Sequence, residues 1–177
     1  MTLSEPYRRF CRTHLRFALV MLLVALLAGV CFQESAKKVP ITAAVPIGAH
    51  LEYLLSLALV HGHIFLVGVL LPLAFTWMLH LGLTLGLEPV PPKVLAWTTG
   101  LYLPGATLTI LLMLLKGYHL VLGVRHGATD FTRLNAAFLG SHPLRAGAYG
   151  LAHTVMALGI AFLVRALWRS LKAPSVG

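Results

Sequence analysis

Charged residues are scarce in this sequence, and acidic ones are the scarcest. Only 11% of the 177 residues are charged, five are Asp or Glu, and 58% are hydrophobic. A soluble domain carries about 25% charged residues. The scarcity of charge therefore excludes an ordinary soluble domain and predicts an integral membrane protein.

Cysteine is also scarce, since Cys11 and Cys31 are the only two. They lie near opposite ends of the first apolar segment, about 30 Å apart along a helix, which excludes a disulfide within one chain. Neither belongs to a Cys-x-x-Cys-His motif, so covalent c-type haem attachment is excluded.

The basic residues give a net charge of +9. In a soluble protein this excess would suggest nucleic acid as a partner. Here Lys and Arg cluster at the ends of apolar segments, where they meet lipid headgroups and orient the spans. We therefore expect membrane lipid as the partner and exclude nucleic acid.

The apolar segments predict four spans, at about 16–32, 50–80, 93–119 and 145–167. Each is about as long as the roughly 20 residues that cross a bilayer core or longer, and Pro72 predicts a kink in the second. The expected fold class is all-α, a four-helix bundle that forms a single transmembrane domain over residues 1–177. The first segment is expected to be retained, because it lacks a clear small-x-small cleavage site.

A short interfacial helix is predicted between spans three and four. Phe131, Leu134 and Phe138 share one helical face there, and Thr129 and Asp130 can cap its start. Eight Lys and Arg residues lie on the side of both termini and six on the other. This bias predicts that both termini lie in the cytoplasm.

Stripes of small and hydroxylated residues predict the inward faces of the last two spans. The third span carries Thr98, Tyr102, Gly105, Thr109 and Lys116 on one face. The fourth carries Ala146, Gly150, His153, Ala157 and Ile160 on one face.

Three of the nine histidines, His61, His63 and His153, lie well away from the ends of the predicted spans, and ionisable groups at that depth are functional by default. The second and fourth spans run in the same direction, so His61 and His153 are both expected about 12 to 15 Å below the outer surface. Two imidazoles at matched depth are what a buried b-type haem needs as axial ligands. We therefore predict haem b between His61 and His153.

His63 points about 200° away from His61 on an ideal helix. His61 shares its stripe with Gly68, where we expect room for a flat cofactor, so it is favoured as the bundle-facing ligand. His63 is the alternative ligand or part of a second site. At the outer end His119 is a further candidate, and Lys116 is expected to pair with haem propionates.

Other interpretations remain open for these residues. The histidines can form helix–helix hydrogen bonds in a structural or assembly subunit of a larger respiratory complex or homo-oligomer. A transition-metal site is sparse, because the nearest carboxylate, Glu52, is more than two turns from His61. A small transporter that titrates His61, His63 and Lys116 ranks last. Four histidines are expected near an interface or in a loop, without a ligand: His14, His80, His126 and His142.

Two resemblances follow from short motifs. The segment Val60 to Gly68 (VHGHIFLVG), a later proline and the GLAH sequence ending at His153 resemble a family of four-span bacterial membrane proteins classified as a domain of unknown function. Locally, His61-Gly62 followed by Pro72 is similar to the second helix of the catalytic subunit of haem-copper oxidases.

In those oxidases the histidine of this pair ligates the low-spin haem, so the resemblance implies haem b on His61. No set of copper ligands accompanies the motif, so oxygen reduction is not implied. Two axial imidazoles favour electron transfer or haem handling over catalysis.

Overall fold

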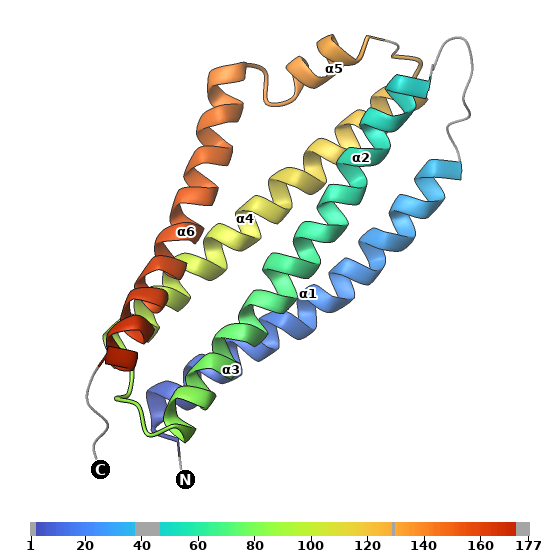
Figure 1. The fold of residues 1–177 in the computed structure, drawn as a ribbon. Helices are drawn as coiled ribbons and strands as arrows, with labels where there is room; N and C mark the ends of the chain where they lie inside the picture. The colour runs from blue at the N-terminus through green and yellow to red at the C-terminus, as the bar shows by residue number, and fades with distance from the viewer. Residues whose placement is uncertain (1–2, 38–46, 129, 173–177) are drawn as a thin grey trace.

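A computed structural model describes residues 3–37, 47–128 and 130–172 of the chain. The regular structure in these residues is helical, and Figure 1 shows long helices packed into one bundle. The elements are α1 (Glu5–Lys37), α2 (Ile47–His63), the π-helix η1 (Ile64–Leu70), α3 (Leu71–Thr84), α4 (Pro92–Arg125), α5 (Phe131–Ala137) and α6 (His142–Lys172). The predicted all-α bundle is confirmed.

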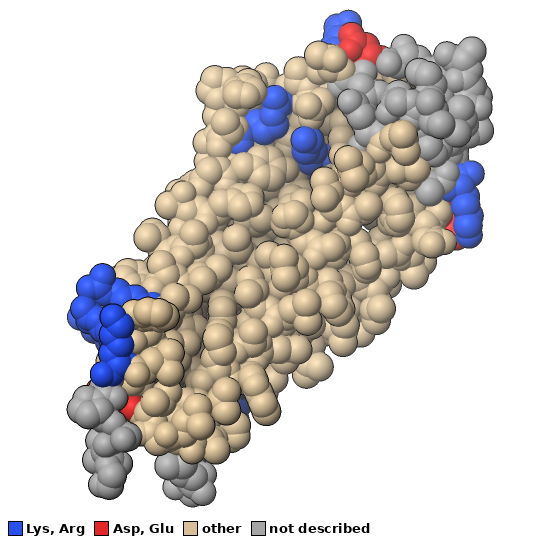
Figure 2. Space-filling model, viewed as in Figure 1, with Lys and Arg blue, Asp and Glu red and all other residues tan. Residues whose placement is uncertain are grey.

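Four helical segments are long and apolar enough to cross a membrane: Glu5–Ser35, Leu54–Thr84, Pro92–Arg125 and His142–Lys172. They have 31 to 34 residues; the first, third and fourth are longer than the sequence predicted, and the second has the predicted length. Figure 2 shows Lys and Arg gathered toward the two ends, with a wide region free of charge between them. The chain is a multi-pass membrane protein.

The second span combines α2, η1 and α3. At the end of η1 the N–H of Leu71 donates to the carbonyl of Leu66, five residues back. In that register the carbonyl of Val67 would accept from Pro72, which has no N–H. The hydroxyl of Tyr102 donates to Val67 instead. The irregularity predicted at Pro72 therefore takes the form of a π-helix just before it, closed by a side chain of α4.

The closest contact between spans is the crossing of α4 and α6. A Cβ on Gly105 would lie 2.5 Å from the backbone nitrogen of Met156, and one on Gly159 would lie 2.7 Å from that of Tyr102. Real Cβ atoms do not approach backbone so closely, so both positions need glycine. We call this contact the glycine crossing; close backbone approach through small residues is how spans associate in lipid.

The predicted inward face of the third span is confirmed, since Thr98, Tyr102, Gly105 and Thr109 are buried in α4. The predicted face of the fourth span is wrong. Ala146, Gly150, His153 and Ala157 are exposed, and Ile160 is half-buried. The buried residues of α6 are Ala152, Gly159, Leu163 and Ser170. The glycine crossing determines which face of α6 is buried, because Gly159 is the residue of α6 that allows its backbone to approach Tyr102 of α4.

His14 is buried inside the bundle, a packing that the sequence did not predict. Its ring stacks on Phe10 with centroids 3.9 Å apart and lies 6.2 Å from both Phe75 and Tyr102. Its Nδ1 is 3.0 Å from the carbonyl of Phe10. Its Nε2 has no hydrogen-bond partner among the described residues.

The predicted short helix between spans three and four is confirmed as α5. The carboxylate of Asp130 accepts from the N–H of Arg133 and caps its start. Thr129, the other predicted cap, lies outside the described residues. Arg145 of α6 donates to the carbonyl of Asn135 at 2.7 Å, which fastens α5 to α6.

Candidate ligand-binding cleft

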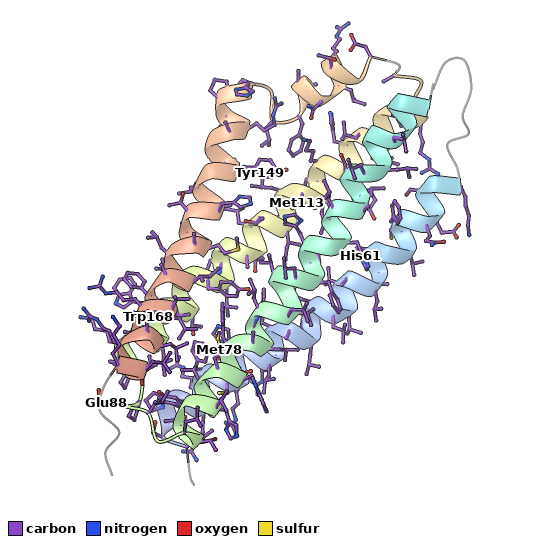
Figure 3. All side chains as sticks on the ribbon, viewed as in Figure 1. His61, Met78, Glu88, Met113, Tyr149 and Trp168 are labelled. Carbon is purple, nitrogen blue, oxygen red and sulfur yellow. The ribbon has the colours of Figure 1, made fainter. Side chains whose placement is uncertain are left out.

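A cleft of about 220 Å³ lies where α2, α4 and α6 meet, beyond the glycine crossing. Figure 3 shows Tyr149 of α6 between α6 and α4, and it labels Met113 on α4. We call it the histidine cleft. Its lining residues are Ser56, Leu59, Val60 and His63 of α2, Met113, Lys116 and Gly117 of α4, and Tyr149 and His153 of α6.

Both histidines of the cleft are held by their own helices in the same way. Nδ1 of His63 is 3.0 Å from the carbonyl of Leu59, and Nδ1 of His153 is 2.8 Å from that of Tyr149. A carbonyl only accepts, so Nδ1 carries the proton in each ring and Nε2 keeps its lone pair. Each ring is therefore set in the tautomer that offers Nε2 to a metal.

Lys116 and Tyr149 supply the other polar groups. Among the described residues the ion pairs join Arg8 to Glu5 and Lys37 to Glu34, so Lys116 has no carboxylate partner there. The hydroxyl of Tyr149 donates to the carbonyl of Leu112 at 3.0 Å, which ties α6 to α4 beside the cleft. The half-buried ammonium of Lys116 thus favours an anionic group in the cleft.

His61, which the sequence favoured as the partner of His153, faces α1. Its Nδ1 is 2.9 Å from the carbonyl of Ala25, and its ring lies 3.1 Å from where a Cβ on Gly29 would be. The structure therefore brings His63, and not His61, into one cleft with His153. His61 instead fastens the second span to α1.

The expected space beside Gly68 is filled. Gly68 is buried, and a Cβ there would lie 2.8 Å from Cβ of Met21 in α1. His119 lies outside the cleft as well, since its Nε2 is 2.9 Å from the carbonyl of Leu134 in α5.

No group of three or more His, Cys, Asp or Glu side chains is placed to hold a metal ion within the described parts of the chain. The described residues of the cleft therefore offer two imidazoles and no third ligand of these types. A cofactor that needs only two protein ligands fits this donor set better than a bare ion.

Sequence reasoning missed Met113, Tyr149 and Ser56 as lining residues. The signal for Tyr149 was present, because it lies four residues before His153 and so on the same side of α6. Met113 and Lys116 are likewise neighbours three residues apart on α4. Ser56 gave no signal that distinguishes it from an ordinary polar residue of a span.

Comparison with protein-family models, curated proteins and solved structures finds no match to this chain. The functional argument therefore rests on the residues of the cleft.

Proposed function

We propose that this protein binds b-type haem non-covalently in the histidine cleft, with His63 and His153 as the two axial ligands. The observation that carries the proposal is the shared tautomer of the two rings. In both, Nδ1 is bonded to a backbone carbonyl at 2.8 to 3.0 Å, which leaves Nε2 for iron. Such outer hydrogen bonds orient metal-ligating histidines and raise their basicity.

The remaining groups of the cleft suit a haem. Leu59, Val60 and Met113 supply an apolar wall for the macrocycle. Lys116 has no carboxylate partner among the described residues, and a haem propionate would provide one. The local similarity to haem-copper oxidases also supports haem binding, although it implies His61 rather than His63 as the ligand.

The cleft has to widen to admit a whole haem. Its 220 Å³ is below the roughly 300 to 1,000 Å³ of common ligand pockets. We expect α6 to move outward to widen the cleft, because it packs mainly on α4 and leans away from α2 beyond the glycine crossing (Figure 1). Gly147 and Gly150 of α6 have no atoms within 4 Å of a Cβ built on them, so this part of the helix has space to move.

The chemistry that follows is one-electron transfer or haem handling. Two axial imidazoles saturate the iron and leave no position for oxygen, so we propose an electron-transfer or accessory protein rather than a catalyst. The excess of basic residues at the end where α1 begins and α6 ends supports cytoplasmic termini. In that orientation the histidine cleft lies in the outer half of a bacterial inner membrane.

An oxidised and a reduced absorbance spectrum test the proposal. Protein purified from haem-replete cells should show a Soret band that sharpens and shifts on reduction by dithionite, and His153→Ala should lose it. His80→Ala is the matched control, because His80 is exposed on α3 outside the cleft.

Colourless wild-type protein that takes up no added haemin would overturn the proposal. If fixed partner subunits then co-purify with it, a structural or assembly subunit of a larger membrane complex becomes the better account.

A further inference from the structure

A second and larger cleft lies at the other end of the bundle, between the first turns of α1 and α4. Its volume is about 450 Å³. We call it the α1–α4 groove. Its polar residues include Arg9, Thr13 and Thr99, and its apolar ones include Phe10 and Leu95.

The groove carries an uncompensated positive charge. Glu5 is the only carboxylate that lines it, and both Nε and Nη2 of Arg8 donate to that carboxylate, at 3.1 and 2.7 Å. Arg9, which also lines the groove, forms no ion pair with any described residue. A cation of this kind beside an apolar wall favours an anion with an apolar body.

The position of the groove along the spans points to the source of that anion. Arg9 is four residues into α1 and Thr99 is seven residues into α4, which places them about 6 and 10 Å from the ends of these helices. In a membrane protein this is the depth of the headgroups and the upper acyl chains, where lipid phosphates are the abundant anions. Pro6 is half-buried and Ala96 is exposed where they line the groove, so both offer apolar surface to an acyl chain.

We propose that the α1–α4 groove is a specific site for an anionic glycerophospholipid with a hydroxylated headgroup, such as phosphatidylglycerol. Arg9 pairs with the phosphate, and an acyl chain lies along Pro6 and Ala96. The hydroxyl of Thr99 donates to the carbonyl of Leu95 at 3.0 Å, so its oxygen is left to accept from a headgroup hydroxyl. This site is independent of the histidine cleft.

Native mass spectrometry of the full chain in non-ionic detergent measures lipid retention directly. The probes are dioleoyl phosphatidylglycerol, dioleoyl phosphatidylcholine and soluble glycerol 1-phosphate. We expect one phosphatidylglycerol to be retained in preference to phosphatidylcholine, with no competition from glycerol 1-phosphate. Equal retention of the two lipids, or displacement by glycerol 1-phosphate at matching concentration, would overturn the assignment to an anionic lipid.

Two variants test the groove by charge and by shape. Arg9→Gln should weaken phosphatidylglycerol retention roughly fivefold, as expected for one cation at a membrane surface. Arg12→Gln is the control, since Arg12 is exposed on α1 but does not line the groove. Gly100→Leu should place an apolar side chain in the groove; Gly100 lines the groove, and a Cβ on it meets no atom within 4 Å.

Gly100→Leu tests the site independently of charge, because it changes no charged residue and replaces a helical glycine by a better helix former. If Gly100→Leu retains phosphatidylglycerol as the wild type does, the lipid lies elsewhere and the proposal fails. Equal losses in Arg9→Gln and Arg12→Gln would show diffuse surface charge in place of a site and would also contradict it.

Discussion

The contact between α4 and α6 has two parts that differ sharply. At the glycine crossing the backbones touch, because Gly105 faces Met156 and Gly159 faces Tyr102 without room for a Cβ. Farther along, the same helices diverge and leave the histidine cleft, lined by Lys116 and His153. The crossing shows where the bundle is fixed, and the cleft shows where packing is left incomplete around polar groups.

The difference teaches how a small bundle can hold a ligand. Most of the buried residues of α4 are apolar. The cleft, by contrast, contains two imidazoles and an ammonium that has no carboxylate partner among the described residues. Polar groups at membrane depth cost free energy unless they find partners. The tight crossing near the middle of α6 supplies the stability that the unfilled cleft does not.

The largest expected effect comes from breaking the crossing. Gly105→Leu would force its side chain into the backbone of Met156, which cannot relax as a flexible side chain does. Overpacking of this kind costs typically about 1 to 3 kcal/mol and more against backbone. We expect loss of folded protein in size-exclusion chromatography, while Gly100→Leu on the same helix should elute as the wild type. Normal elution of both variants would contradict the observed packing.

A smaller loss of stability is expected from Tyr102→Phe, which leaves the carbonyl of Val67 without a donor beside Pro72. An unsatisfied buried polar group costs about 1 to 3 kcal/mol. The thermal midpoint in detergent should fall, whereas Tyr118→Phe should change little because Tyr118 is 40% exposed. Equal midpoints for the Tyr102 variant and the wild type would mean that the π-helix does not depend on this hydrogen bond.

On the cleft side, Lys116→Gln tests the role of this cation, which has no ion-pair partner among the described residues. If it holds a haem propionate, its loss should weaken haemin affinity about tenfold, the value of one hydrogen bond to a charged group. Haemin titration followed at the Soret band measures this. Arg125→Gln, an exposed cation toward the same end of α4, should bind haemin as the wild type does. A wild-type affinity in Lys116→Gln would remove Lys116 from the site.

The smallest expected effect is a gain. Gly150→Ala lies on α6 beyond the crossing, where a Cβ meets no atom within 4 Å. Replacing a helical glycine there should stabilise the protein by about 0.5 to 1 kcal/mol. Gly159→Ala, at the crossing, should have the opposite sign. Differential scanning calorimetry in detergent would measure the change in stability of both variants. If both changes had the same sign, the two parts of the α4–α6 contact would not differ as described.

Much of the fold could be predicted from hydropathy and helical period. The four spans and α5 follow from apolar runs and caps, and the buried stripe of α4 follows from residues such as Thr98 and Thr109. The face of α6 could not be predicted, because small residues occur on several sides of it. Only the tertiary contact selects Gly159 for the crossing and leaves Gly150 exposed.

The candidate site was predicted in its residue types but not in its pairing. Sequence spacing separated His61 from His63 correctly, but it could not say which neighbour each would meet. The neighbours are set by α1, which packs against Gly68 and whose Ala25 carbonyl accepts a hydrogen bond from the ring of His61. Which spans lie next to each other in a bundle depends on tertiary packing, and the helical periodicity of a single sequence does not reveal it.

The central claim, that the ligand side of the second span is the side of His63, is tested most directly by two matched substitutions. His63→Gln and His61→Gln each replace an imidazole by an amide, and both are measured as haem absorbance per protein after purification from haem-replete cells. We predict that His63→Gln loses the bis-imidazole spectrum while His61→Gln keeps it. Loss of the spectrum in His61→Gln with retention in His63→Gln would contradict the account.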